Sequence, residues 1–151
     1  MSPHPKRFDR PTTYGSTDFL LLADQFRDVP DQMRSRLAAR LRPIGERTVA
    51  DAKARASWST RIPAAIHLRV SFSGKNPGLI ITVDHTVAPH ARAYEGIVYD
   101  VFRHPLFADR EHWYDQKSRR YVWPAVQATQ QEVADLADDV IDEVFEAAGF
   151  Y

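Results

Sequence analysis

Apolar side chains recur every three or four residues in two long stretches of the chain. The first stretch, residues 28–58, carries them at Val29, Met33, Leu37, Leu41, Ile44 and Thr48, and continues with Val49, Ala52 and Ala56. The second opens at Pro124 and ends near Gly149, with apolar positions at Val126, Thr129, Val133, Leu136, Val140 and Val144. This spacing predicts two long amphipathic helices. Pro43 lies inside the first and predicts a kink or a break there, because proline lacks the N–H of the helical hydrogen bond.

Between these two stretches the pattern changes to strict alternation. In residues 65–72 the apolar side chains point to one side and the polar ones to the other, with Ile66, Leu68, Val70 and Phe72 on the apolar side. Residues 79–84 repeat the alternation after a turn rich in Gly, Asn and Pro. Alternation is typical of a half-buried strand, so the two segments predict an antiparallel hairpin with one buried face.

Residues 85–120 show weak periodicity but carry many aromatic side chains, namely Tyr94, Tyr99, Phe102, Phe107, Trp113 and Tyr114. We expect a short helix at residues 88–95, a short strand at residues 119–123 and otherwise a long extended loop, a feature that is often functional. Because large aromatic side chains are costly to leave in water, they are expected to pack on this domain or on a neighbour.

The first residues carry basic side chains and prolines but no apolar run, so neither a signal peptide nor a membrane span is expected. Residues 1–16 are predicted to form a flexible arm and residues 17–151 a single domain. Ser16 and Thr17 are candidate N-caps for a short helix at residues 18–26. The expected fold is α+β, with a kinked N-terminal helix, a small antiparallel sheet, a long aromatic-rich loop and a C-terminal helix packed on the sheet.

The formal net charge is zero, from 20 basic and 20 acidic residues, but the two signs are segregated along the chain. Residues 27–55 hold eight basic and four acidic side chains, whereas residues 121–151 hold seven acids and neither Lys nor Arg. Asp142, Glu143 and Glu146 lie near a helix C-terminus, where the helix dipole disfavours negative charge. Solvation with salt screening would offset this, and so would the basic surface of the first helix, within the chain or on the next subunit. The latter arrangement suits a head-to-tail contact that closes into a ring.

The chain contains no Cys, which excludes disulfides and thiolate metal sites. His85, His90, His104 and His112 lie in the loop region beside several acids, but not at a spacing typical of a zinc site. No serine has a nucleophile-elbow context, and no Gly-rich phosphate-binding loop is present. We therefore expect no enzyme, no catalytic residue, no metal and no cofactor. Two alternatives stay open: a small metal-dependent hydrolase that uses these histidines, and a DNA-contacting module that uses the basic helix.

Three stretches, in this order, resemble one protein family. The first runs through Ala56-Ser57-Trp58-Ser59 to Arg61-Ile62-Pro63. The second is His90-Ala91-Arg92-Ala93-Tyr94-Glu95-Gly96 with Phe102-Arg103-His104-Pro105-Leu106-Phe107 after it, and the third is Tyr121-Val122-Trp123-Pro124-Ala125-Val126. Their order and spacing resemble the minor tail or tail-completion proteins of long-tailed bacteriophages, over residues 28–150. Ile62-Pro63-Ala64-Ala65 departs from the family, in which many members have a Gly-containing link.

The resemblance implies a structural role in the virion, assembled in the bacterial host cytoplasm: a ring in the neck or upper tail that joins head to tail. The implied partners are copies of the chain, neighbouring connector and tail proteins and, passively, DNA in the lumen, but no membrane. The tail terminator ring of the same particle is the alternative position. The expected anchors are the loop aromatics Phe102, Phe107, Trp113 and Tyr114. The charged side chains expected to set subunit order are Arg34, Arg36, Arg40, Asp138, Asp142 and Glu146.

Overall fold

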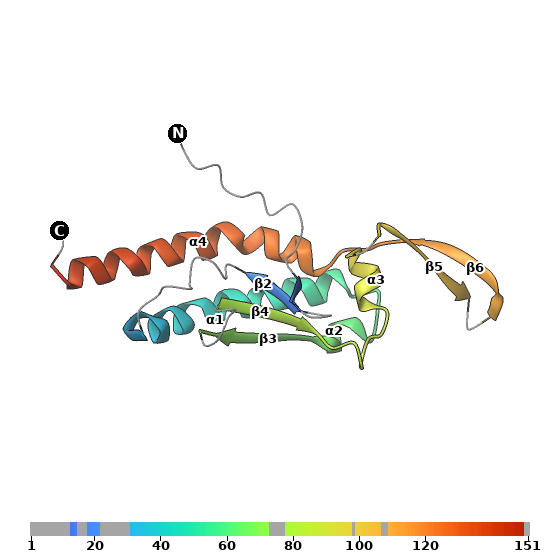
Figure 1. Ribbon diagram of the computed structural model, residues 1–151, viewed down its shortest axis with the longest axis horizontal. Helices are drawn as coiled ribbons and strands as arrows, with labels where there is room; N and C mark the ends of the chain where they lie inside the picture. Colours follow the sequence, from blue (N-terminus) through green and yellow to red (C-terminus); the bar gives the residue numbers. More distant parts are fainter. Residues whose placement is uncertain are drawn as a thin grey trace, which may run out of the picture.

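The computed structural model describes residues 13–14, 18–21, 31–72, 78–97, 99–106 and 109–149 (Figure 1). The fold is α+β, as predicted. In chain order the elements are β1 (Thr13–Tyr14), β2 (Asp18–Leu21), α1 (Asp31–Arg55), α2 (Ile62–Ala65), β3 (Ile66–Ser71), β4 (Gly78–Val83), α3 (Ala91–Glu95), β5 (Val101–Leu106), β6 (Asp109–Lys117) and α4 (Val122–Ala147). One antiparallel sheet has the order β1-β2-β4-β3, and β5 and β6 form a second sheet of two strands.

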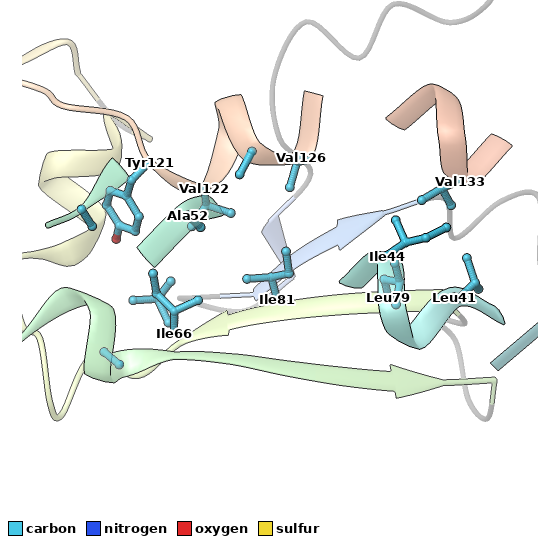
Figure 2. Packing of buried hydrophobic residues seen from close by; sticks show 14 of the residues in the cluster. Leu41, Ile44, Ala52, Ile66, Leu79, Ile81, Tyr121, Val122, Val126 and Val133 are labelled. Carbon is cyan, nitrogen blue, oxygen red and sulfur yellow. The ribbon is translucent and has the colours of Figure 1, made fainter. Parts of the chain in front are cut away.

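The two long helices confirm the two apolar periodicities of the sequence. α1 packs on β3 and β4, and α4 lies along α1 (Figure 1). Figure 2 shows Val122, Val126 and Val133 of α4 directed toward α1 and the sheet. They share one hydrophobic core with Leu41 of α1 and Ile81 of β4. A single core between two helices and a sheet therefore holds the body together.

A pair of threonines joins the helices inside this core. The buried hydroxyl of Thr48 donates to the Ile44 carbonyl at 2.8 Å and lies 3.0 Å from the hydroxyl of Thr129. Thr129 in turn lies 3.3 Å from the carbonyl of Ala125. The two polar side chains on the predicted apolar stripes are thus satisfied by each other and by their own helices.

Pro43 lies within α1 and does not end it, so the predicted alternative of a broken helix is wrong. The residue is exposed, and so is Ala39, one turn earlier. The Ala39 carbonyl, which proline leaves without its usual N–H donor, therefore lies on the side of the helix that water reaches. Placement on the solvent side lets the helix continue through a proline.

The hairpin predicted by alternation is present as β3 and β4, with Ile66 opposite Val83 and Leu68 opposite Ile81. β4 also pairs with β2, which makes it a central strand. Ile80, on the face opposite Ile81, is also buried, so the prediction of one buried face holds for β3 but not for β4. One side of the sheet faces α1, which explains the alternation of β3.

The helix predicted at residues 18–26 is wrong over its first part. Asp18–Leu21 forms β2, which pairs antiparallel with β4 and places Phe19 opposite Ile81. A short apolar run does not distinguish a helix from a buried strand, and pairing with the open side of β4 decides the outcome. Residues 22–26 and the proposed caps Ser16 and Thr17 lie outside the described residues. β1 falls within residues 1–16, whose other members also lie outside them.

The long loop predicted within residues 85–120 is wrong over much of its length. The chain forms α3 and then a β-hairpin of β5 and β6, in which Arg103 lies opposite Asp115 and Pro105 opposite Trp113. The expected short helix is α3, but the strand expected at residues 119–123 is absent, because α4 begins at Val122. The hairpin projects from the body beyond α3 (Figure 1), and β6 is exposed along nearly all of its length. Without a covered face it lacks the alternation by which a half-buried strand is identified.

Candidate interaction site at the base of the hairpin

The stretches that carry the family resemblance meet at one place, the base of the β5–β6 hairpin. Trp58 follows α1, Tyr94 belongs to α3 and Phe102 to β5. The ring centroids of Trp58 and Tyr94 are 4.7 Å apart, and those of Tyr94 and Phe102 are 5.0 Å apart in edge-to-face geometry. The guanidinium of Arg119 lies over the Trp58 ring, 5.5 Å from its centroid. Trp58, Tyr94 and Phe102 form an aromatic row that joins the body to the hairpin.

A buried carboxylate closes the same base. Glu95, the last residue of α3, is 2% exposed and accepts the backbone N–H groups of Tyr121, Val122 and Trp123 at 2.7–3.0 Å. N–H groups at the start of a helix have no acceptor within the helix itself. Because Pro124 has no N–H, Glu95 satisfies every N–H of residues 121–124. A side chain from α3 therefore supplies the cap of α4.

Burial raises the pKa of the Glu95 carboxyl, and the three N–H donors and the nearby Arg120 guanidinium oppose that rise. Tyr121 is buried beside it and its hydroxyl donates to the Ala91 carbonyl at 3.1 Å. Burial, with the charge of Glu95, also raises the pKa of Tyr121 well above its usual range. Neither group reaches solvent, so their hydrogen bonds hold the base together.

Further hydrogen bonds fix both ends of the hairpin. The N–H of Arg119 donates to the carbonyl of Tyr94, and the N–H of Ser118 to the carbonyl of Asp100, both at 2.7 Å. The Arg120 guanidinium contacts the Asp100 carboxylate at 3.0 Å. These contacts therefore join the start of the hairpin to its end, next to the body of the protein.

Beyond the base of the hairpin, β6 is exposed on both faces. Cross-strand partners share a face, so Trp113 and Pro105 lie on one side, and Tyr114 and His104 on the other. Trp113 is 49% exposed and Tyr114 48% exposed. The indole N–H of Trp113 donates to the Arg110 carbonyl at 2.8 Å, which orients the ring along its own strand. Two large aromatic side chains therefore face solvent, one from each face.

The predicted aromatic anchors fall into three groups. Trp113 and Tyr114 are exposed, as contact with a partner requires. Phe102 is half-buried in the aromatic row, so it supports the hairpin instead of offering a free surface. Phe107 lies outside the described residues.

The predicted basic residues of α1 also divide. Arg40 pairs with Glu143 of α4 at 2.7 Å, so part of the acidic charge of α4 is offset within the chain. Arg34 pairs with Asp31 in the first turn of α1 at 3.0 Å. Arg36 is exposed on the same helix.

The acidic residues predicted to face other subunits are all exposed on α4: Asp138, Asp142 and Glu146. Within the described part of the chain none of them forms an ion pair. A second pair between the helices, Arg47 with Glu132, lies nearer the middle of α4. The C-terminal end of α4 therefore keeps an acidic surface after the internal pairs are formed.

The histidines considered as metal ligands do not assemble into a site. His112 contacts Asp109 at 2.8 Å on the exposed hairpin. Two of the others lie beside a cavity of about 260 Å³, lined by His90, Tyr94, Phe102, His104 and Pro105. In the ranges that the structure describes, no three His, Asp or Glu side chains gather closely enough to hold a metal ion.

Glu95 and Tyr121 were not among the residues predicted for the site, although the sequence contains a signal for them. α4 begins without Ser, Thr, Asp or Asn at its start and without an acid in its first turn, so its N–H groups need an acceptor from elsewhere. Glu95 ends a short helix, where a carboxylate is locally disfavoured. Each feature alone is weak, and together they point to the observed contact.

No protein-family model, curated protein or solved structure matches this chain. Of the helices in the described ranges, none combines the length and the apolar character that a membrane crossing requires. The functional interpretation therefore depends on the hairpin, on its base and on the family resemblance of the sequence.

Proposed function

We propose that this chain is a structural virion protein of a tailed bacteriophage, one subunit of a ring in the neck or upper tail that joins head to tail. The observation that carries the proposal is the exposed hairpin, whose base is built by the stretches that resemble the tail-completion family. The chain would act by contact, with copies of itself and with neighbouring connector and tail proteins.

The contacts that hold the base of the hairpin support this role. A two-stranded ribbon alone is marginally stable in water, because it buries little apolar surface. Here Glu95 and the aromatic row hold its base, while β6 is left uncovered. Trp113 and Tyr114 supply the kind of large, stiff side chain that dominates the energetics of protein interfaces. A firmly held but uncovered ribbon is typical of an element that becomes buried on assembly.

The charge distribution supports contact between identical copies. The ion pairs between α1 and α4 leave an acidic surface at the end of α4, and Arg36 stays exposed on α1. Opposite charges on different surfaces of one subunit favour a head-to-tail contact, which closes into a ring when the rotation allows. Such charges set subunit order and association rate more than affinity.

The test is deletion of the gene in the phage that encodes it, with particles examined by electron microscopy and then complemented by the intact chain. Full heads and tails of normal length that fail to join are the expected result, with the chain detected by mass spectrometry in complemented virions. Overlong tails would instead assign the chain to the tail terminator ring. Normal virions formed without the chain, or complemented virions that lack it, would overturn the proposal.

A further inference from the structure

Among the described strands, β3 ends the four-stranded sheet on one side. Leu68 and Val70 of β3 are half-buried, whereas their partners Ile81 and Leu79 on β4 are fully buried. The difference arises because β4 has a strand on each side and β3 has a strand on only one. A further strand beside β3 would cover what Leu68 and Val70 leave exposed.

The backbone of β3 also directs N–H and C=O groups toward the side where a further strand would pair. Ala65 accepts the N–H of Asp84 at 2.8 Å, which continues the β3–β4 ladder by one step. Because hydrogen-bonded pairs alternate along an antiparallel ladder, Ile66, Leu68 and Val70 direct their N–H and C=O groups away from β4. Natural sheet edges are commonly blocked by a bulge, a proline or a very short strand. The opposite edge, β1, has two residues, but β3 has six and carries no such block.

The hairpin offers a strand that suits this edge. β6 has nine residues and no proline, so each of its residues has both a backbone N–H and a carbonyl. β5 contains Pro105, which removes a donor. Residues 110–112 of β6 lie opposite no residue of β5, so residues 113–117 are the part of β6 with a regular outer edge. The outer edge of β6 is therefore the edge of the hairpin suited to pairing.

The two faces of β6 match the two faces of β3. In the regular part of β6, Trp113 and Asp115 lie on one face and Tyr114 lies on the other. On β3, Arg69 is exposed on the solvent face and forms no ion pair within the described residues. When β6 runs parallel to β3 with Tyr114 beside the half-buried apolar side chains of β3, Asp115 comes next to Arg69. Asp115 contacts Arg103 of its own hairpin at 3.4 Å, and Arg69 gives it a second basic neighbour.

We propose that β6 of one copy adds to the free edge of β3 in the next copy, so that the hairpin extends the sheet of its neighbour. This inference rests on the proposed ring and names the contact that closes it, a strand of one copy on a sheet edge of another. Figure 1 shows the hairpin beyond α3 at one end of the body and β3 along the body, so one copy uses both surfaces at once.

The absence of cysteine from the chain makes disulfide cross-linking a direct test. Arg69→Cys is combined in one chain with a cysteine at position 113 or 115. The matched controls place the second cysteine at position 114 or 116, whose side chains face the other way. The full chain is oxidised at high protein concentration and also in purified virions. We expect a ladder of disulfide-linked multimers from the first set and loss of that ladder in the second.

Single variants separate the alternative pairings. A mixture of Arg69→Cys and Trp113→Cys chains should give a linked heterodimer and no homodimer. A homodimer of Arg69→Cys alone would indicate that β3 pairs with β3 about a two-fold axis, and it would overturn the proposal. The absence of cross-links from all double variants in both settings would overturn it too. If virions lack the chain, the proposed role in the virion is wrong, but the strand pairing is still tested by cross-linking of the purified chain.

Discussion

The carboxylate of Glu95 accepts the backbone N–H of Trp123 at 2.7 Å, so the end of α3 contacts the first turn of α4. The whole β5–β6 hairpin lies between these two residues in the chain. Tyr121 and Val122 donate to the same carboxylate. The segment between α3 and α4 is therefore tied at both ends by one side chain.

Replacement of Glu95 by alanine should lower the free energy of unfolding by about 2–4 kcal/mol. The substitution leaves the N–H groups of Tyr121, Val122 and Trp123 without an acceptor, and the first two of these residues are fully buried. Urea denaturation of the purified full chain measures the loss. Glu95→Gln keeps one acceptor oxygen and should lose less.

Glu111→Ala is the matched control for this substitution. Glu111 is an exposed acid on β6 and forms no ion pair in the part of the chain that the structure describes. Its removal should change the free energy of unfolding by about 0.5 kcal/mol or less. Equal losses for the two alanine variants would mean that the cap contributes nothing to stability.

The Glu95 carboxyl also gives stability a pH dependence of definite sign. Burial raises its pKa in the folded chain, so in mildly acidic solution, above its ordinary pKa, the folded state keeps a proton that the unfolded state has lost. In that window the unfolded chain binds fewer protons, and stability therefore falls as pH rises. Urea denaturation at a series of pH values should show the natural chain losing stability relative to Glu95→Gln across the window. A constant difference would contradict the expected shift.

Gly96→Ala should destabilise the chain by more than Gly149→Ala. Both glycines have left-handed backbone, with φ of 71° and 77°, which costs an alanine about 1–2 kcal/mol. At Gly96 the added Cβ would also lie 2.9 Å from the Ser118 hydroxyl, whereas at Gly149 nothing lies within 4 Å. Thermal denaturation of both variants compares the two losses. Equal losses would mean that Ser118 moves aside at no cost.

The sequence predicts well those elements on which one buried face imposes a period. α1 keeps Leu37 and Leu41 against the core, and α4 keeps Val133 and Val140 there, so each shows a helical stripe. β3 alternates because α1 covers one of its faces. β2 has four residues, too few to show a period, and its pairing with the distant strand β4 decides its conformation.

The hairpin and its base are beyond local patterns for a different reason. β6 is exposed on both faces, so no core imposes alternation on it, and its conformation depends on pairing with β5. Glu95 lies in a stretch that carries the family resemblance, but its role depends on N–H groups 26 to 28 residues away. Charge is easier to interpret from sequence: opposite net charges on two helices predict attraction, and Arg40 indeed pairs with Glu143.

Trp113→Ala should leave the purified chain folded and block the joining of heads to tails. The indole is 49% exposed, and among the described residues its N–H donates to the Arg110 carbonyl of its own strand, so its loss should cost the fold about 0.5 kcal/mol or less. At an interface the same truncation typically costs about 2 kcal/mol or more. Urea denaturation measures the first effect, and counts of joined particles after complementation of the gene-deleted phage measure the second.

Tyr99→Ala separates the anchor from general loss of an exposed aromatic side chain. Tyr99 is 71% exposed and precedes β5, outside both strands of the hairpin. Because Tyr99 belongs to neither strand of the proposed contact, its truncation should leave the number of joined particles unchanged. If tails attach normally with Trp113→Ala, Trp113 is not an anchor. If Tyr99→Ala blocks the joining of heads to tails equally, the block does not depend on the hairpin face that carries Trp113.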